Sequence, residues 1–409
     1  MIIFDGAAIV NMLKPIGVKT FQDYATHVFL PFIKAKLQNV QRVDIIWDVY
    51  VEDSLKSTAR ENRGKGVRRR VAPSNAIPGK WQEFLRLSDN KTELYTFLAH
   101  QIVENFSGDK EVYTTCGQNV LCSRIVQDVS PLAPCSHEEA DTRIFLHAVH
   151  CANKGYRRIM IRTVDTDVLV LSISIVARLE NTEIWIAFGT GKHLRYIPAH
   201  EIAKELGSEK AKALPMFHAF TGCDTVSSFA GKGKKTAFDT WKIFDDVTTV
   251  FSTLYENPSA FNDDCMSVLE KYVVLLYDRT SSETTVNSAR KNIFTTKSRS
   301  IENIPPTRAA LLQHTKRALY QGGHVWGKAL VCNPLLPSPQ LYGWQKSESK
   351  GWLPLWTLLP EAAASCSALL RCGCKKGCRG SCKCVKAALK CTSLCLCNGN
   401  CDNENRSYE

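Results

Sequence analysis

The stretch that decides the fold of this chain is PCSHEEADTRIFLHAVHCANKGYRRIMIRTVDTDVLVL, residues 134–171. Apolar residues recur at helical spacing in its first half, and Gly155 follows them as a glycine that ends a helix. Residues 158–162 predict a buried strand, and Asp165 and Asp167 come just past its carboxyl end. Carboxylates therefore flank one short α/β unit.

Acidic side chains at both ends of this unit predict a metal site. Glu139 and Asp141 begin the predicted helix, and they can face Asp165 and Asp167 because ligands of open α/β sheets bind beyond the carboxyl ends of the strands. Clustered carboxylates repel one another unless divalent cations are bound, and Mg²⁺ or Mn²⁺ prefer such oxygen ligands. A solvated helix start with acidic caps and a turn is the simpler alternative.

Composition restricts the class of protein. The chain has 409 residues, of which 44% are hydrophobic and 22% charged, which is typical of a globular protein with one large and one small domain or two medium ones. Its net charge of +12 favours a polyanionic partner. The longest apolar run is about ten residues, half of the roughly 20 that a bilayer requires, so we expect no membrane association.

Cysteine usage indicates the compartment. Residues 1–10 have no basic region and contain Asp5, so they do not resemble a signal peptide. We therefore expect an intracellular, reduced protein whose 17 cysteines bind metal where they cluster. Because the first predicted strand starts at residue 1, we also expect further residues before it.

Strands that end in aspartates recur along the first half of the chain. Residues 1–5 predict a strand ending in Asp5, followed by a helix through Leu13, and residues 43–47 predict a second strand followed by Asp48. Further strands are predicted at 111–115, 120–121 and 183–188, and helices at 81–106 and 200–206. This alternation predicts an α/β fold with a mostly parallel sheet and helices on both faces.

Two basic segments accompany the acids. The first follows Asp48 and holds Lys56, Arg60, Arg63, Lys65, Arg68, Arg69 and Arg70. A solvated helix face or a nuclear-import patch has such a composition, but beside a metal site these charges suit phosphate chemistry. The second, FTGCDTVSSFAGKGKK at 220–235, adds Asp224 and places Gly231 and Gly233 in a turn between helices. Its backbone N–H groups can hold a phosphate with help from Lys234 or Lys235, although the spacing excludes a Walker A loop.

The acidic motifs occur in the order F-D-G, W-D, E-A-D, D-T-D and G-C-D, followed by G-K-G-K-K. This series resembles the flap-endonuclease/XPG branch of the PIN-like nucleases over residues 1–245. The resemblance implies a helix-two-turn-helix near 221–240 and two Mg²⁺ or Mn²⁺ ions. The implied ligands are Asp5, Asp48, Glu139, Asp141, Asp165, Asp167 and Asp224.

The resemblance also implies how nucleic acid is held. Lys56, Arg60 and Arg63 correspond to the residues that grip the scissile phosphate. The turn glycines with Lys235 correspond to a duplex-binding element that can hold K⁺, although Lys232 stands where the family has a hydrophobic residue. Asp141 stands where the family has a glutamate.

The C-terminal part carries the most specific pattern. Residues 246–332 predict a helical extension, 333–365 a Pro- and Trp-rich linker, and 366–402 a zinc domain with the spacing CxC-x3-C-x3-CxC-x6-C-x3-CxC-x3-C. Three tetrahedral zinc ions have twelve ligand positions, so nine thiolates fill them only if three bridge. The nine are Cys372, Cys374, Cys378, Cys382, Cys384, Cys391, Cys395, Cys397 and Cys401.

This pattern resembles the tesmin-type CXC domain, a nine-cysteine, three-zinc module that binds DNA. Basic residues, among them Lys375, Lys376 and Arg379, outweigh the net negative charge of the zinc cluster. Ser381 stands where DNA-reading members have a tyrosine, and only one repeat is present, so a protein-interaction role is the alternative.

The sequence thus predicts a nuclear, metal-dependent nuclease that hydrolyses DNA by a two-metal mechanism and is selective for DNA structure. RNA is an alternative substrate. A non-catalytic nucleic-acid-binding or chromatin scaffold with the same fold is the rival hypothesis. We interpret His147, His150 and Cys151 as residues of the central helix and not as zinc ligands.

Overall fold

The computed structural model describes residues 1–61, 66–124, 128–296, 303–348, 350–357, 371–375 and 377–403. Arg63 and Lys376, both predicted to bind nucleic acid, lie outside these residues. The chain divides into two compact units. The first comprises residues 1–226, 251–260 and 317–354, and the second comprises residues 227–250, 261–316 and 355–409.

A seven-stranded sheet with the order β4-β3-β2-β1-β5-β6-β7 forms the centre of the first unit. The parallel strands are β1 (Ile2–Asp5), β2 (Arg42–Ile46), β3 (Glu111–Cys116), β5 (Arg158–Thr163) and β6 (Glu183–Phe188). The antiparallel strands β4 (Asn119–Cys122) and β7 (Arg195–Pro198) lie at the two edges. The predicted α/β fold with a mostly parallel sheet is confirmed.

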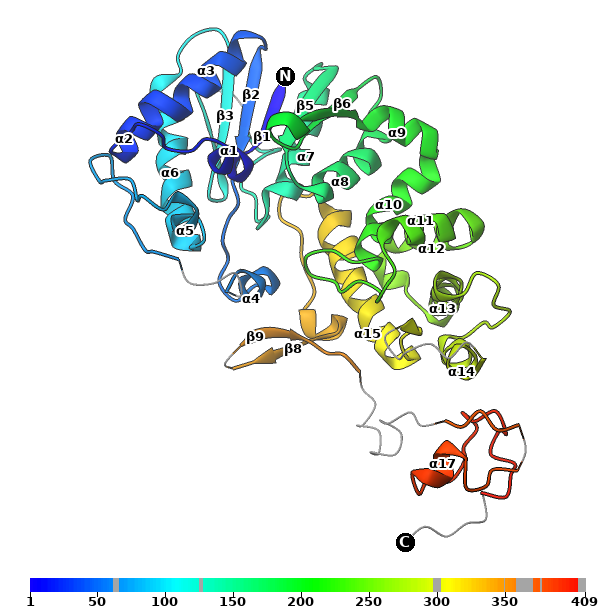
Figure 1. The fold of residues 1–409 in the computed structure, drawn as a ribbon. Helices are drawn as coiled ribbons and strands as arrows, with labels where there is room; N and C mark the ends of the chain where they lie inside the picture. The colour runs from blue at the N-terminus through cyan, green and yellow to red at the C-terminus, as the bar shows by residue number, and fades with distance from the viewer. Residues whose placement is uncertain are drawn as a thin grey trace. The chain divides into compact units, whose positions relative to one another are not determined.

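Helices cover both faces of this sheet (Figure 1). On one face, apolar side chains of β1 and β2, such as Val43 and Ile45, join a buried cluster with α3 (Leu30–Gln38) and α6 (Ser88–Asn105). Asp44 lies between Val43 and Ile45 in β2. Its side chain therefore points to the opposite face of the sheet, because side chains alternate along a strand. There it contacts α7 (Ala140–Asn153).

The remaining helices of the first unit are short, and several connect strands directly. They are α1 (Gly6–Met12), α2 (Phe21–Tyr24), α4 (Leu55–Glu61), α5 (Trp81–Phe84), α8 (Thr166–Val176), α9 (Ala199–Leu206) and α10 (Ser208–Phe220). Two π-helical turns, Ala25–Phe29 and Leu319–Val325, and the hairpin of β8 (Trp344–Ser347) and β9 (Gly351–Pro354) also belong to this unit. The hairpin gives regular structure to part of the predicted linker.

The second unit is mainly helical and includes the cysteine-rich segment, whereas residues 251–260 and 317–332 of the predicted helical extension belong to the first unit. The predicted helical extension holds α12 (Val247–Glu256), α13 (Asp263–Tyr277), α14 (Val286–Thr296) and α15 (Arg308–Ala318). Ahead of it, α11 spans Lys234–Ile243, and α17 (Lys383–Lys386) lies within the cysteine-rich segment. Within the described ranges, no helix is both long and apolar enough to cross a bilayer.

Local expectations and the structure differ mainly at element ends. The central unit is as predicted, since α7 ends before Gly155, which has a φ of 89°, and β5 follows. The helix predicted over 81–106 is interrupted, because α5 ends at Phe84 and α6 starts at Ser88. The edge strand β7 was not predicted, because Arg195–Pro198 is half polar and exposed at its start.

Candidate functional site

Carboxylates gather at the carboxyl edge of the three central strands. Asp5 ends β1, Asp48 follows β2 and Asp165 follows β5, and these strands are parallel neighbours. The first turn of α7 is tied to the same edge, because Ala140 N–H donates to Asp48 Oδ1 at 2.9 Å. That bond brings Glu139 and Asp141 of the same turn to this edge.

Close packing fixes the passage from β1 to α1. A Cβ at Gly6 would collide with the ring of Trp47, so only glycine fits after Asp5. The Trp47 indole in turn donates from Nε1 to Thr114 Oγ1 at 2.9 Å. The F-D-G and W-D motifs therefore hold each other in place, and each presents its aspartate at the same edge.

Three aspartates approach one another most closely. Ligand oxygens of Asp141, Asp165 and Asp167 lie within 4.8 Å of one another. Asp165 caps α8, since its Oδ1 accepts the N–H of Asp167 at 2.8 Å. Asp167 Oδ1 also lies 2.9 Å from His218 Nε2. One oxygen of each residue is thus available around a single point, with the carboxylates held by the local backbone and by His218.

Asp5 is the most buried acid of the group, with 7% of its surface exposed. Its Oδ1 accepts the N–H of Ala8 at 3.1 Å, and its Oδ2 accepts the hydroxyl of Thr163 at 3.1 Å. Burial, and then the charge of Asp48, raises the pKa of Asp5 to about 7. The free carboxylate is therefore costly in this position.

A lysine lies inside the acidic cluster. Lys56 Nζ is 2.5 Å from Glu139 Oε1 and 3.8 Å from Asp224 Oδ2, and Asp224 is itself exposed. Burial raises the pKa of Glu139 to about 7 despite the opposing effect of Lys56. Burial, and then the charge of Glu139, raises the pKa of Asp141 well above its usual range.

The structure therefore brings together the seven predicted acids. The pKa of Asp165 is raised as well, by burial and then by Asp167, and Asp224 also contributes. Crowded carboxylates with raised pKa values are relieved when a divalent cation replaces the protons. The donor set of hard oxygens fits Mg²⁺ or Mn²⁺, and the closest trio provides the core of such a site.

The predicted basic residues are engaged differently from the expectation. Arg60 Nη2 lies 2.5 Å from Glu138 Oε1, which also accepts the Ser54 hydroxyl at 2.7 Å. Arg68 Nη2 lies 2.5 Å from Glu93 Oε1. The remaining members of this basic group that the structure describes, Arg69 and Arg70, are exposed. Both paired arginines thus neutralise protein carboxylates.

The glycine turn belongs to the second unit. Gly231 has a φ of 66°, a region that favours glycine, and Gly233 is the residue before α11. Lys234 and Lys235 are the first residues of that helix, as the turn between helical pieces required. The Lys232 ammonium lies 5.1 Å from the ring centre of Tyr277, a cation–π contact within the second unit.

His218 is a site residue that the sequence reasoning missed. It lies in α10 among apolar residues, and it contacts Asp167 although 51 residues separate the two. A single histidine in an apolar helix has no spacing that marks it as part of a site. Only the packing of α10 against α8 reveals its role.

The histidines of α7 take part in a buried polar network. Asp44 Oδ2 lies 2.6 Å from His147 Nδ1, and Arg42 Nε donates to Asp44 Oδ1 at 2.7 Å. Arg42 Nη2 lies 3.1 Å from His150 Nδ1. His147 and His150 thus each contact a charged residue of β2. These contacts explain why two histidines can be buried in the core.

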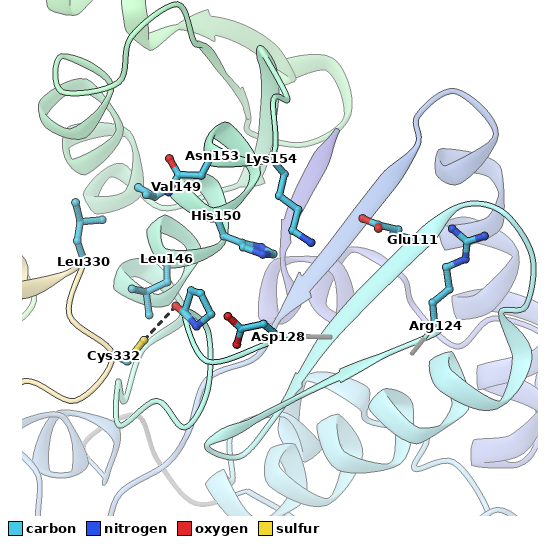
Figure 2. A pocket seen from close by; sticks show the side chains of 11 residues that line it. Glu111, Arg124, Asp128, Leu146, Val149, His150, Asn153, Lys154, Leu330 and Cys332 are labelled. Atoms are coloured by element: carbon cyan, nitrogen blue, oxygen red, sulfur yellow. Dashed lines mark hydrogen bonds between the residues drawn. The ribbon is translucent and has the colours of Figure 1, made fainter. Parts of the chain in front are cut away.

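A large cleft of the first unit lies at the other end of α7 from the acids. It has a volume of about 1070 Å³, and Figure 2 shows His150 of α7 and Lys154, the residue after α7, on one side and Glu111 of β3 on the other. Arg124 and Asp128 add one charge of each sign. The lining is of mixed charge and selects neither anions nor cations.

The cysteine-rich segment forms a compact cluster of thiols. Three groups of four sulfur atoms lie within 4.8 Å of one another: Cys372, Cys378, Cys382 and Cys391; Cys372, Cys391, Cys395 and Cys397; and Cys378, Cys391, Cys397 and Cys401. Two thiolates on one tetrahedral zinc lie about 3.8 Å apart, because each Zn–S bond is about 2.3 Å. The Sγ atoms of Cys384 and Cys395, at 3.5 Å, and of Cys372 and Cys391, at 3.8 Å, have this spacing.

The three groups share ligands, but more unevenly than nine thiolates with three bridges would, because together they contain seven of the nine cysteines and neither Cys374 nor Cys384. Cys391 occurs in all three groups, and Cys372, Cys378 and Cys397 each occur in two. The cluster therefore has the chemistry of a metal-thiolate site, and soft thiolates in tetrahedral groups fit zinc. Cys374 packs against the cluster and is only partly buried.

Comparison with models of known protein families found no match to this chain, and comparison with curated proteins found none either. The sheet, the acidic cluster at its edge and the thiol cluster are therefore argued from the residues and their geometry. The chain is an α/β protein with two groups of side chains that can hold metal ions.

Proposed function

We propose that this chain is a metal-dependent nuclease that hydrolyses phosphodiester bonds in DNA. The observation that carries the proposal is the gathering of seven acids, predicted as one set from their order, at the carboxyl edge of β1, β2 and β5. A structural role alone gives no reason to crowd buried carboxylates whose pKa values are raised. The order of the acids along the strands also supports a PIN-like domain of the flap-endonuclease type.

The residues of the site suit the binding of two Mg²⁺ or Mn²⁺ ions. Asp141, Asp165 and Asp167 would hold one ion, and Asp5 and Asp48 provide oxygens toward a second. Such ions supply an activated water and stabilise charge on the attacking and leaving oxygens of a phosphodiester.

Neighbouring residues of the chain position these ligands. His218 holds Asp167, and Thr163 holds Asp5 through its hydroxyl. Lys56 neutralises Glu139 and lies beside the exposed Asp224. If a metal ion binds the Glu139 carboxylate, the Lys56 ammonium becomes free to bind a phosphate. We propose DNA as the substrate, with RNA as the alternative that the cleavage test below separates.

The cysteine cluster supplies the second part of the proposal, a zinc module that binds DNA. Its thiols suit zinc, and the three groups of four overlap, as bridging thiolates between neighbouring ions would require. Exposed Lys375 and Arg379 provide positive charge near the cluster. Together with the net charge of +12, this favours a nuclear protein bound to DNA. A K⁺ ion at the glycine turn is a further element of the family resemblance.

One observation favours a rival function, a non-catalytic scaffold. Lys56 and Arg60 already neutralise Glu139 and Glu138, so part of the acidic surface is balanced by the protein's own cations. A scaffold that binds nucleic acid without cutting it does not need metal ions to neutralise the acids at this edge of the sheet. The two functions make opposite predictions about cleavage.

Cleavage of labelled flap, nicked and single-stranded DNA and of RNA, with Mg²⁺ or Mn²⁺, tests the proposal. We compare the wild type with the double variant Asp165→Asn/Asp167→Asn and with Asp109→Asn, a control at a fully exposed position. We expect the double variant to lose cleavage by about two orders of magnitude or more while it still binds nucleic acid. Binding by all three proteins with no cleavage by any of them would support the scaffold.

A further inference from the structure

The cleft of Figure 2 contributes no residue to the proposed nuclease site, because it lies at the other end of α7 from the acids. Its volume of about 1070 Å³ is enough to hold a drug-sized ligand. Part of its lining is apolar and consists of Pro131, Leu146, Val149 and Leu330. The rest carries charged side chains of both signs. A ligand that fits this lining therefore has an apolar part and is zwitterionic.

A mostly buried histidine presents a hydrogen-bond donor to this cleft. His150 is 7% exposed, and Figure 2 shows its ring directed into the cleft. Its Nδ1 lies 3.1 Å from Arg42 Nη2, and Nδ1 is the acceptor because a guanidinium only donates. Burial, and then the charge of Arg42, lowers the pKa of His150 to about 4, so near pH 7 the ring is neutral and Nε2 carries the proton. In the described part of the chain no group accepts this N–H, and unlike Nε2 of His147 it is open to the cleft.

Charged groups of both signs lie around His150. Figure 2 shows the Lys154 ammonium and the Glu111 carboxylate directed into the cleft, and no ion pair joins these two described residues. Asp128 lies nearby, and hydrogen bonds from Ser130 lower the pKa of its carboxyl group and keep it ionised. The cleft thus offers an ammonium group and a ring N–H for a carboxylate, and carboxylates for an ammonium group.

A cysteine thiol belongs to the same lining. Cys332 is half-buried, and its Sγ donates to the carbonyl oxygen of Pro131 at 3.2 Å (Figure 2). Its backbone is also held, because its carbonyl oxygen accepts the N–H of Ser136 at 2.9 Å. The next residue, Asn333, donates from Nδ2 to the carbonyl oxygen of Pro134 at 2.9 Å. The thiol therefore has a fixed place beside the charged part of the cleft.

We propose that this cleft binds the disulfide form of the tripeptide glutathione and that Cys332 is the residue that the bound disulfide modifies. Glutathione is a zwitterion with two carboxylates and one ammonium group. Its carboxylates match Lys154 and the Nε2–H of His150, and its ammonium group matches the carboxylate of Glu111. The inference does not rest on the nuclease function, and it adds a modification site to this chain.

The exchange reaction needs no further oxidant. The Cys332 thiol loses its proton to solvent, and its sulfur attacks one sulfur of the disulfide. The S–S bond of the ligand breaks, a new S–S bond joins Cys332 to one glutathione, and the other leaves as a thiolate that takes up a proton. Burial, and then the neighbouring Cys135, raises the pKa of Cys332. Such a thiol is a poor leaving group, so the mixed disulfide forms slowly at neutral pH and is displaced slowly.

The first arm of the test measures the rate of modification at each cysteine of the full chain. The protein reacts with oxidised glutathione or with the neutral 2-hydroxyethyl disulfide, and mass spectrometry of its peptides follows both adducts. Cys265 of α13, a half-buried cysteine outside the cleft lining, is the reference. We expect the rate at Cys332 to saturate with oxidised glutathione and the rate at Cys265 to rise linearly. The preference for glutathione over the neutral disulfide should be about 10-fold or more higher at Cys332 than at Cys265.

The second arm changes the charge of the cleft at an exposed position. Lys154→Met should reduce the glutathione preference at Cys332 about 5- to 10-fold, and Lys154→Arg should retain it. Lys192→Met, at an exposed lysine outside the cleft lining, is the matched control and should behave as the wild type. On the wild-type protein, S-methylglutathione cannot exchange, so it should slow the modification of Cys332 and leave that of Cys265 unchanged.

Three results would overturn the proposal. They are an equal preference for the two disulfides at Cys332 and Cys265, no effect of S-methylglutathione, and a disulfide between Cys332 and Cys135 without any glutathione adduct. None of these measurements depends on cleavage of nucleic acid, so their outcome is separate from that of the nuclease test.

Discussion

Replacing Asp5 by asparagine should stabilise the first unit in the absence of metal. The folded carboxyl has a pKa of about 7 instead of 3.8. In the unfolded chain Asp5 loses its proton near pH 4, and in the folded chain only near pH 7. The free energy of unfolding therefore falls as the pH rises from about 4 to 7. Above pH 7 the whole destabilisation by the ionised carboxylate is present. At about 1.4 kcal/mol per pKa unit, the three-unit shift corresponds to about 4 kcal/mol.

Asparagine keeps the shape of the side chain and removes its charge. Its Oδ1 can still accept the N–H of Ala8, and its amide can donate to the Thr163 hydroxyl. After allowance for relaxation around the ionised carboxylate, we expect the free energy of unfolding to rise by about 2 to 4 kcal/mol near pH 8. Near pH 4 the two proteins should be almost equally stable.

Hydrogen exchange of the β1 amides measures this difference locally, in buffer depleted of Mg²⁺ and Mn²⁺ by a chelating resin so that tightly held zinc remains. The expected gain corresponds to about 30- to 700-fold slower exchange in Asp5→Asn. Added Mn²⁺ should slow exchange in the wild type more than in the variant, since binding to the folded state stabilises it. Asp109→Asn serves as the control. Faster exchange in Asp5→Asn than in the wild type, with an equal response to Mn²⁺, would refute this reasoning.

Three further predictions concern other parts of the chain. Burial lowers the pKa of His150 to about 4, so the first unit should lose up to about 3 kcal/mol of stability as the pH falls from about 6.5 to 4. In urea unfolding curves, His150→Asn should remove this pH dependence. His218→Ala removes the contact to Asp167 and should weaken Mn²⁺ binding about 10- to 100-fold in calorimetric titration, and unchanged affinity would exclude a positioning role. Cys391→Ser should lose more zinc per chain than Cys374→Ser by atomic absorption, because only the former residue lies in all three thiol groups, and equal losses would contradict the shared-ligand arrangement.

The acidic cluster was predictable because each acid is tied to a simple pattern. Asp5, Asp48 and Asp165 follow apolar runs that form parallel strands, and parallel strands end at one edge of a sheet. Glu139 and Asp141 precede a helix whose periodicity is clear. The exact order of the strands was not needed for this prediction, because the carboxyl ends of all parallel strands lie at the same edge of the sheet and bring these acidic side chains together.

Partner choice could not be predicted in the same way. The sequence indicated that Lys56 and Arg60 lie near the acids, but not that each is paired with a glutamate at 2.5 Å. Such pairs depend on the side-chain conformations that the packed structure allows. His218 is brought to its site by long-range packing, for which one sequence has no local signal.

The cysteine spacing specified which residues form the cluster, but not how they share ligands. Nine thiols at fixed intervals predicted bridging, and the structure assigns the greatest overlap to Cys391. That assignment depends on the turns between the motifs, such as the left-handed Gly377 and Gly399, which the spacing alone does not determine.

The central claim is that metal ions held by the acidic cluster contact the phosphate that is cut. Replacing one non-bridging oxygen of the scissile phosphate by sulfur tests it directly, because Mg²⁺ binds oxygen in preference to sulfur and Mn²⁺ tolerates sulfur better. We predict that the sulfur-substituted DNA is cut much more slowly than normal DNA in Mg²⁺ and that Mn²⁺ restores cleavage. Equal cleavage of both substrates in Mg²⁺, or no cleavage of normal DNA with either ion, would contradict the account.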